Sequence, residues 1–135
     1  MKKSRLILAA ALTVGLGATA TMAGDTNINQ LIRQFAAEAG TTPSPDRGKA
    51  FFMGNHTGGK PDTPSCTTCH TSNMRATGKT RAGKPIEPMA PSANPARFTD
   101  SAKVAKWFRR NCKSVVGREC TAAEKADILA WLATQ

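Results

Sequence analysis

Acidic residues, long apolar runs and strand patterns are all scarce in this sequence of 135 residues. Nine aspartates and glutamates stand against nineteen lysines and arginines, which gives a formal net charge of +10 at pH 7. The basic residues are scattered rather than gathered in one run, which indicates a solvated basic surface and not a nucleic-acid-binding tract. Few segments alternate between apolar and polar residues, and this disfavours a fold built on a β-sheet.

The longest apolar stretch covers residues 6–16 and is too short to span a membrane. A span needs roughly 20 predominantly apolar residues, and this stretch ends in glycine and threonine. It follows a basic start and precedes small residues that end at Ala23, an arrangement typical of a secretory signal. We therefore expect residues 1–23 to be a signal peptide cleaved near Ala23, with an uncleaved anchor as the alternative. Residues 24–135 should then form one exported, periplasmic domain.

Four cysteines occur in two pairs of different spacing. Cys112 and Cys120 lie eight residues apart, which favours a disulfide because export carries the chain into an oxidising compartment. Cys66 and Cys69 are three apart, and His70 follows directly, giving a C-x-x-C-H motif. This motif is typical of c-type haem attachment, in which each cysteine forms a thioether to one vinyl group and the histidine ligates the iron.

A structural cysteine pair, half of a zinc site and a redox dithiol are the other interpretations of the C-x-x-C-H motif. Zinc would require a second well-spaced pair of ligands, and the spacing of Cys112 and Cys120 does not provide one. A thioredoxin-like dithiol requires a βαβ context, which the scarcity of strand patterns argues against. The predicted cofactor is therefore one covalent haem c on Cys66 and Cys69, with His70 as the proximal iron ligand.

Helical patterns dominate the rest of the chain and predict an all-α fold. A first helix spans about Asn27 to Ala39, with Thr26 as its cap and an apolar face that packs inward. A second helix has Asp46 as its cap. It carries Gly48 and Phe52, four residues apart, on one face that permits a close helix crossing.

Two more helices are predicted in the C-terminal half. One runs from Ser101 to about Asn111, with Thr99 or Asp100 as its cap. The other opens with a capping box formed by Thr121 and Glu124, and it should cross the second helix.

Two long segments between the helices are rich in glycine, proline and small polar residues, so we expect them to be irregular loops. Residues 54–65 lead into the C-x-x-C-H motif, and residues 74–95 should wrap the haem. A chain of this length has a limited core of its own. The haem is therefore expected to supply a large share of the apolar contacts.

Three side chains compete for the second axial position of the iron. Met89 lies in a loop where an ordinary small cytochrome c carries its methionine ligand. His56 also lies in a loop, but nothing nearby in the sequence orients it. Asn111 ends an apolar helical stripe, and a carboxamide on a buried face requires a partner, which the iron would provide. From the residues alone the choice stays open.

A family resemblance adds to this interpretation. The stretches that carry it are Gly58-Gly59-Lys60-Pro61-Asp62-Thr63-Pro64-Ser65 before the C-x-x-C-H motif, Ala90-Pro91-Ser92, Arg97-Phe98-Thr99-Asp100, Arg110-Asn111-Cys112 and Gly117-Arg118-Glu119-Cys120. They resemble the sphaeroides haem protein (SHP) group, small exported oxygen-binding c-type cytochromes. The resemblance implies a class I cytochrome c-like fold with an extra N-terminal helix. It also implies His70 as the proximal ligand and Asn111, beside the disulfide cysteine Cys112, as the distal ligand.

The identity of the distal ligand decides the expected function. Relatives with histidine at this position release it on reduction, and asparagine favours the oxygen-binding branch. An amide oxygen is a hard donor that suits ferric better than ferrous iron, so Asn111 is expected to leave on reduction and admit O2 or nitric oxide. With Met89 as ligand, the protein would be a simple electron carrier. Whether O2, nitric oxide or peroxide is also turned over is left open.

The resemblance and the charge also suggest partners. Members of the family receive electrons from a dihaem cytochrome c or a membrane b-type cytochrome, so similar donors are expected here. A basic surface suits docking to an acidic redox partner. Neither nucleic acid binding nor stable membrane insertion after signal removal is expected.

Overall fold

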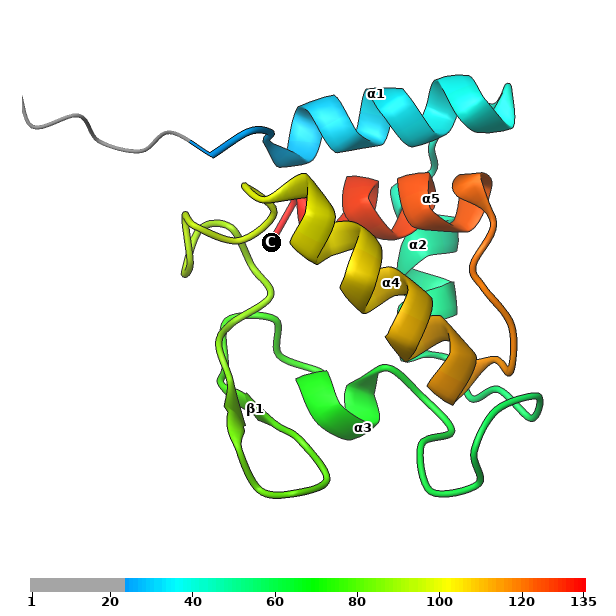
Figure 1. Cartoon of the computed structure of the whole chain (residues 1–135), viewed down its shortest axis with the longest axis vertical. Coiled ribbons are helices and arrows are strands. Elements are labelled where there is room, and N and C mark those ends of the chain that lie inside the picture. The colour runs from blue at the N-terminus through cyan, green and yellow to red at the C-terminus, as the bar shows by residue number, and fades with distance from the viewer. Residues whose placement is uncertain (1–23) are drawn as a thin grey trace, which may run out of the picture.

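Residues 24–135 of this computed structural model form five helices and one pair of short strands (Figure 1). The predicted signal peptide, residues 1–23, lies outside the described residues. Within residues 24–135, no helix combines the length and the apolar character that crossing a membrane requires. The predicted all-α class is confirmed, because the strands contribute only two residues each.

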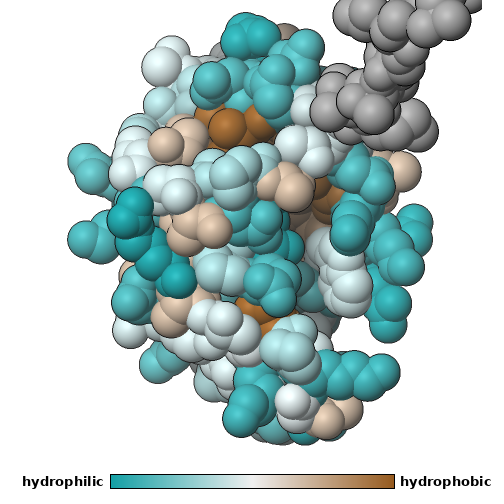
Figure 2. All heavy atoms as spheres, turned by 90° about the vertical axis from the view of Figure 1, so that its left-hand side faces the viewer, coloured by the Kyte–Doolittle hydropathy of each residue, from teal (hydrophilic) through white to brown (hydrophobic). Residues whose placement is uncertain are grey.

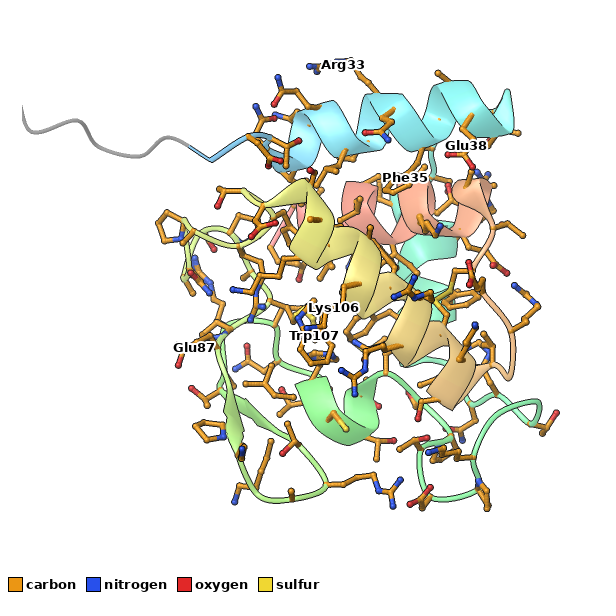
Figure 3. All side chains as sticks on the ribbon, viewed as in Figure 1. Arg33, Phe35, Glu38, Glu87, Lys106 and Trp107 are labelled. Atoms are coloured by element: carbon orange, nitrogen blue, oxygen red, sulfur yellow. A yellow bond between two sulfur atoms is a disulfide. The ribbon has the colours of Figure 1, made fainter. Side chains whose placement is uncertain are left out.

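α1 (Ile28–Ala39) is the predicted first helix, and it begins one residue later than expected. Asn27 caps it by accepting a hydrogen bond from the backbone N–H of Gln30 at 3.0 Å, so the prediction of Thr26 as the cap was wrong. Its inward face buries Leu31 and Phe35. Figure 3 shows Arg33 on the outer side of α1 and Phe35 between α1 and α5.

α2 (Pro45–Met53) begins ahead of the predicted cap. Ser44 is the cap, and its hydroxyl accepts a hydrogen bond from the backbone N–H of Arg47 at 3.3 Å. Pro45 fits the first helical position because its missing N–H would have had no partner there. Asp46 therefore lies in the first turn, where its negative charge interacts favourably with the helix dipole.

α5 (Ala122–Leu132) crosses α2, as predicted. Its capping box is present, with the Thr121 N–H donating to the Glu124 carboxylate at 2.8 Å and the Glu124 N–H to the Thr121 hydroxyl at 3.2 Å. At the crossing the backbones nearly touch, since a Cβ added at Gly48 would lie 1.9 Å from the Asp127 carbonyl oxygen.

An ion pair between Arg47 and Asp127 connects α2 and α5 beside this crossing. The Arg47 guanidinium donates to both carboxylate oxygens of the buried Asp127, at 2.7 and 2.8 Å, and the Ser44 backbone N–H donates to one of them at 2.6 Å. The start of α2 is thereby joined to the middle of α5.

α4 (Ser101–Val115) is the longest helix of the described chain. Asp100 caps it by accepting a hydrogen bond from the Lys103 N–H at 2.8 Å. It continues for a further turn beyond Asn111, the end that the sequence predicted. Asn111 therefore lies inside the helix rather than at its terminus, and Cys112 belongs to its last turn.

Residues 74–95, which were expected to be an irregular loop, contain one pair of short strands. β1 (Gly78–Lys79) pairs antiparallel with β2 (Pro85–Ile86), with Gly78 opposite Ile86. A single turn of helix, α3 (Thr67–His70), precedes the pair and coincides with the C-x-x-C-H motif. The remaining loop around β1 and β2 forms one side of the molecule in Figure 1.

The molecule contains an apolar core and, next to it, a hollow region. α1, α2 and α5 enclose the apolar core, with Phe52 and Trp131 rings 5.2 Å apart at its centre. α3, the loops and α4 surround a hollow region that adjoins this core, since Phe52 of α2 and Ile128 and Leu132 of α5 also line it. Figure 2 shows a mostly hydrophilic face, with apolar atoms visible in recesses between the polar side chains.

Candidate functional site

A cavity of about 960 Å³ lies between α3, the loops that flank β1 and β2, and α4. Pockets for small molecules and cofactors usually measure about 300 to 1,000 Å³, so this volume suits a large cofactor. Cys66, Cys69, His70, Met89 and Asn111 all line the cavity. The fold therefore brings together all the candidate haem-binding and iron-ligating residues that the sequence indicated, except His56.

The α3 wall is held by a short network of hydrogen bonds. The buried Ser65 hydroxyl accepts from the Thr67 N–H at 3.2 Å and donates to the Phe52 carbonyl of α2 at 3.3 Å. Thr71 ends the turn with a φ of 61°, a value that is uncommon for a β-branched residue. These contacts fix the direction in which α3 presents its side chains.

The surroundings of His70 favour a neutral imidazole, the form that can bind a metal. Burial, and secondarily the positive charge of Arg97, lowers the pKa of the His70 imidazole to about 4. Its Nδ1 is buried without a hydrogen-bond partner in the described part of the chain. An unpaired buried nitrogen is unfavourable by about 1 to 3 kcal/mol and is the kind of exception that functional sites tolerate. A neutral imidazole retains the lone pair that a metal requires.

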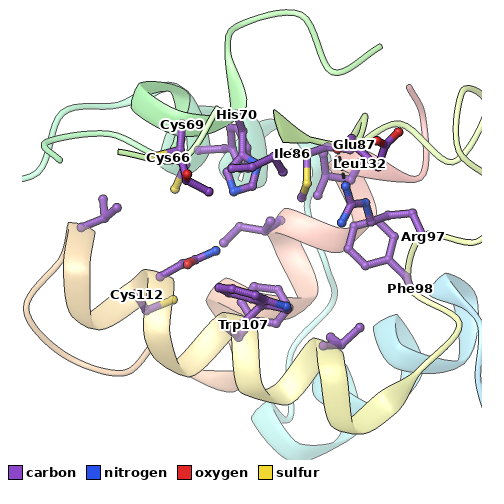
Figure 4. A pocket seen from close by; sticks show the side chains of 18 of the residues that line it. Cys66, Cys69, His70, Ile86, Glu87, Arg97, Phe98, Trp107, Cys112 and Leu132 are labelled. Atoms are coloured by element: carbon purple, nitrogen blue, oxygen red, sulfur yellow. Dashed lines mark hydrogen bonds between the residues drawn. The ribbon is translucent and has the colours of Figure 1, made fainter. Parts of the chain in front are cut away.

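Cys66 and Cys69 form no disulfide within residues 24–135, and both line the same cavity. Burial raises the pKa of the Cys66 thiol to about 11, so it remains protonated at neutral pH. Figure 4 shows both cysteines and His70 along one wall. Two thiols and an adjacent imidazole on one wall of a large cavity fit a covalent haem.

The opposite wall is formed by the predicted apolar stripe of α4. Val104, Phe108 and Asn111 line the cavity together with Trp107, and Figures 3 and 4 show Trp107 on the side of α4 that faces α3. Trp107 is 45% exposed. The stripe thus faces the space for a cofactor, and the carboxamide of Asn111 belongs to that wall.

The basic residues next to Asn111 point elsewhere. Arg109 and Arg110 are exposed, and neither lines the cavity. The Arg110 guanidinium lies 5.4 Å from the centre of the Trp107 ring, at a distance suited to a cation–π contact. The solvated basic face is therefore the better description of both arginines.

Two features hold the C-terminal end of α4 in place. The predicted disulfide between Cys112 and Cys120 is present, with a Cα–Cα distance of 5.6 Å. In addition, the Ser114 carbonyl accepts hydrogen bonds from the Lys60 N–H at 2.7 Å and the Thr63 hydroxyl at 3.0 Å. We call the contact of Lys60 and Thr63 with Ser114 the seam. It ties the segment before Cys66 to the helix that carries Asn111.

Met89 and His56 differ in position. Met89 is half-buried and lines the cavity, so it remains a geometric alternative to Asn111. His56 does not line the cavity. Its Nε2 lies 2.9 Å from the Phe51 carbonyl oxygen, and its ring packs on the Phe51 ring at 4.7 Å. These contacts hold His56 against Phe51, outside the lining of the cavity.

Arg97 is a residue of the site to which the sequence analysis gave no role. It lines the cavity and is half-buried, whereas Arg81, Lys84 and Lys103, which line the same cavity, are exposed. It belongs to a stretch that carries the family resemblance, Arg97-Phe98-Thr99-Asp100, but the sequence analysis assigned it no role. Only the loop that follows β2 gives it this position.

A family model described as a domain of unknown function, DUF1924, matches residues 38–132. Among curated proteins, the chain is 57% identical over 130 residues to the "cytochrome c-type protein SHP" of Cereibacter sphaeroides, covering 96% of this chain and 97% of that protein. It is 38% identical over 94 residues to "cytochrome c''" of Methylophilus methylotrophus, covering 69% of this chain and 65% of that protein.

Two solved structures are also similar. A structure of oxidised SHP, titled an oxygen-binding cytochrome c, matches with a TM-score of 0.81 and 60% identity, covering 83% of this chain and all of that one. The crystal structure of oxidised cytochrome c'' from Methylophilus methylotrophus matches with a TM-score of 0.70 and 34% identity, covering 81% of this chain and 94% of that one.

Proposed function

We propose that this chain, which belongs to the SHP family of c-type cytochromes, accepts an electron and then binds a small ligand such as O2 or nitric oxide at its haem iron. It is a cytochrome with one covalent haem c. The observation that carries the proposal is the cavity that has Cys66, Cys69 and His70 on one wall and Asn111 on the wall formed by α4. The similar SHP structure is described as that of an oxygen-binding cytochrome c, which supports the ligand class.

Each haem-binding residue has a distinct role in this proposal. Cys66 and Cys69 hold the haem through thioether bonds, and His70 provides the proximal ligand through its neutral imidazole. The bound haem supplies an iron that alternates between ferric and ferrous states. The low pKa of His70, about 4, supports this role because the imidazole stays unprotonated at neutral pH.

Asn111 controls access to the other side. Its amide oxygen is a hard donor, which stabilises the ferric state and interacts weakly with the ferrous state. Asn111 would therefore hold the iron in its ferric state and release it on reduction, and the haem would then supply the site for a small ligand. The disulfide at Cys112 and the seam at Ser114 keep the α4 backbone fixed, so only the side chain has to move.

A visible spectrum of the ferrous protein tests the open site. Under argon we expect a five-coordinate, high-spin spectrum, because Asn111 has withdrawn and no stronger ligand replaces it. Addition of carbon monoxide or nitric oxide should then produce a low-spin spectrum at stoichiometric ligand. A ferrous spectrum that is low-spin under argon and unchanged by either gas would contradict the proposal.

The second candidate function is a simple electron carrier. Met89 lines the same cavity, and a thioether sulfur prefers ferrous iron and would keep the distal side closed. The same ferrous spectrum separates the two functions, because Met89 ligation predicts the unreactive low-spin form.

Charge supports docking to an acidic electron donor, such as a dihaem c-type or membrane b-type cytochrome. Lys103, Lys106, Arg110 and Lys113 recur at helical spacing on α4 and are exposed. We expect the rate of reduction by an acidic donor cytochrome to fall about tenfold or more between low and high ionic strength, because salt screens this attraction. Stopped-flow kinetics at several salt concentrations measure the effect. A rate that does not change with salt would argue against electrostatic docking.

We further propose that the protein acts in the periplasm after removal of residues 1–23. The basic and apolar N-terminal pattern supports export, and a disulfide is typical of an oxidising compartment. The intact mass of protein purified from a periplasmic extract reports signal cleavage and the attached haem together. A mass that retains residues 1–23 would contradict cleavage.

A further inference from the structure

We propose that Arg97 binds a propionate of the haem and holds that carboxylate ionised. The inference rests on the proposed attachment of the haem at Cys66 and Cys69, because attachment there fixes which edge of the haem meets Arg97. No role for Arg97 follows from the motif or from the ligand candidates.

The Arg97 guanidinium is oriented by backbone carbonyl groups. Its Nε donates a hydrogen bond to the Pro88 carbonyl at 3.0 Å, and one terminal nitrogen donates to the Glu87 carbonyl. A guanidinium has five N–H donors, so these two bonds leave donors for a further acceptor. Because Arg97 also lines the cavity, that acceptor can belong to the cofactor.

The charge of Arg97 has no ion-pair partner within residues 24–135. The four ion pairs there involve Arg47, Arg81, Lys113 and Arg118. Burial lowers the pKa of the Arg97 guanidinium, and the nearby negative charge of Glu87 opposes this effect only in part. A partly buried cation of this kind is stabilised by a desolvated anion that forms paired hydrogen bonds with it.

The position of Arg97 matches the chemistry of the haem edge. Figure 4 shows Arg97 at the end of the cavity away from Cys66 and Cys69. A haem carries its two vinyl groups and its two propionates on opposite edges. Thioether bonds from the cysteines to the vinyl groups therefore direct the propionates toward Arg97, where a carboxylate can accept two hydrogen bonds from the guanidinium.

Other charged groups on the cavity are less suited to this role. The side chain of Arg81 is 57% exposed and already pairs with Asp62 at 2.9 Å. Lys84, Glu87, Asp100 and Lys103 also line the cavity and are exposed, so solvent screens their charges. His70 lines the cavity as well, but it is assigned to the iron. Arg97 is therefore the cation expected to dominate the ionisation of the propionate.

The pH dependence of the reduction potential of the holoprotein tests the role of Arg97. A cation in contact with a carboxylate lowers its pKa by about 1 to 3 units. In Arg97→Gln the propionate pKa should rise by that amount, so the pH range in which the potential changes moves upward. Arg97→Lys keeps the charge but loses the paired geometry, and its shift should be smaller. Arg81→Gln, on the same cavity but paired to Asp62, is the matched control and should not move the profile.

The outcomes distinguish this inference from the proposed function. A profile in Arg97→Gln identical to the wild type, or moved equally by Arg81→Gln, would overturn the role of Arg97. Should Arg97→Gln not accumulate, an Arg97→Lys profile that coincides with the wild type would have the same meaning. The alkaline pyridine spectrum of the wild type counts thioether bonds independently. Absence of two thioethers there would overturn the haem attachment instead.

Discussion

Replacement of Asn111 by alanine is expected to raise the affinity of the ferric protein for azide or imidazole by about tenfold or more. In the proposed function Asn111 would compete with added ligands, so the apparent affinity would equal the intrinsic affinity multiplied by the fraction of molecules in which the site is open. If Asn111 occupies the ferric iron in at least nine molecules of ten, at most about one molecule in ten has an open site. Removal of Asn111 should then raise the apparent affinity about tenfold or more. The ferric spectrum should also change toward that of a water-ligated iron.

The ferrous protein should respond differently to the same substitution. Since Asn111 is proposed to have withdrawn already, the affinity for carbon monoxide should change by no more than about twofold. Spectrophotometric titrations of both oxidation states provide the comparison.

Met89→Leu is the matched control, because Met89 lines the same cavity and leucine preserves most of its volume. It should leave both titrations unchanged. If Met89→Leu opens the ferric site and Asn111→Ala has no effect, the distal ligand is Met89 and the protein is an electron carrier.

A second large effect is expected from Gly48→Ala, which should destabilise the fold by about 3 kcal/mol. The added Cβ would lie 1.9 Å from the Asp127 carbonyl oxygen and 2.8 Å from the Ile128 nitrogen, so both contacts are with backbone that cannot rotate away. Alanine has a helix propensity about 1 kcal/mol more favourable than glycine, which opposes the clash without cancelling it. Urea unfolding followed by circular dichroism measures the difference.

Lys49→Ala provides the comparison for Gly48→Ala. Lys49 is the next residue of α2 and is exposed, so its replacement should change the free energy of unfolding by less than about 0.5 kcal/mol. A Gly48→Ala protein as stable as the wild type would show that α2 and α5 can separate at little cost.

Much of the fold was predictable because its determinants are local. The apolar spacing of α1, the capping box of α5 and the small residue at Gly48 each indicate their structure within a few neighbouring residues. The disulfide between Cys112 and Cys120 was also predictable, since the two cysteines are close in sequence. These features depend little on distant parts of the chain.

The structure differs from the sequence prediction where contacts between distant segments determine the ends and caps of helices. α4 continues past Asn111 because its last turn carries the disulfide and packs against the loop before Cys66, where the seam bonds Ser114. The choice of Ser44 over Asp46 as cap follows from the position of Pro45 together with the bond from the Ser44 N–H to Asp127.

In the candidate site, too, the features set by neighbouring residues were predictable and those set by distant contacts were not. Cys66, Cys69 and His70 are recognisable from spacing alone, and the structure brings them to one cavity with Asn111. The burial of Arg97 is set by two carbonyl groups of a loop and by the cavity itself, and no local pattern encodes it. The exclusion of His56 likewise depends on its contact with Phe51 in three dimensions.

The seam of Lys60 and Thr63 with Ser114 has a consequence for the conformational entropy of the chain. A bond from the iron to Asn111 would close a loop of about forty residues that begins at His70, and opening such a loop normally releases a large conformational entropy. The hydrogen bonds of Ser114 to Lys60 and Thr63 already close a loop that contains this one. If Asn111 is the distal ligand, its dissociation would free a side chain and not a segment, so it could leave and return while the chain around it remains folded.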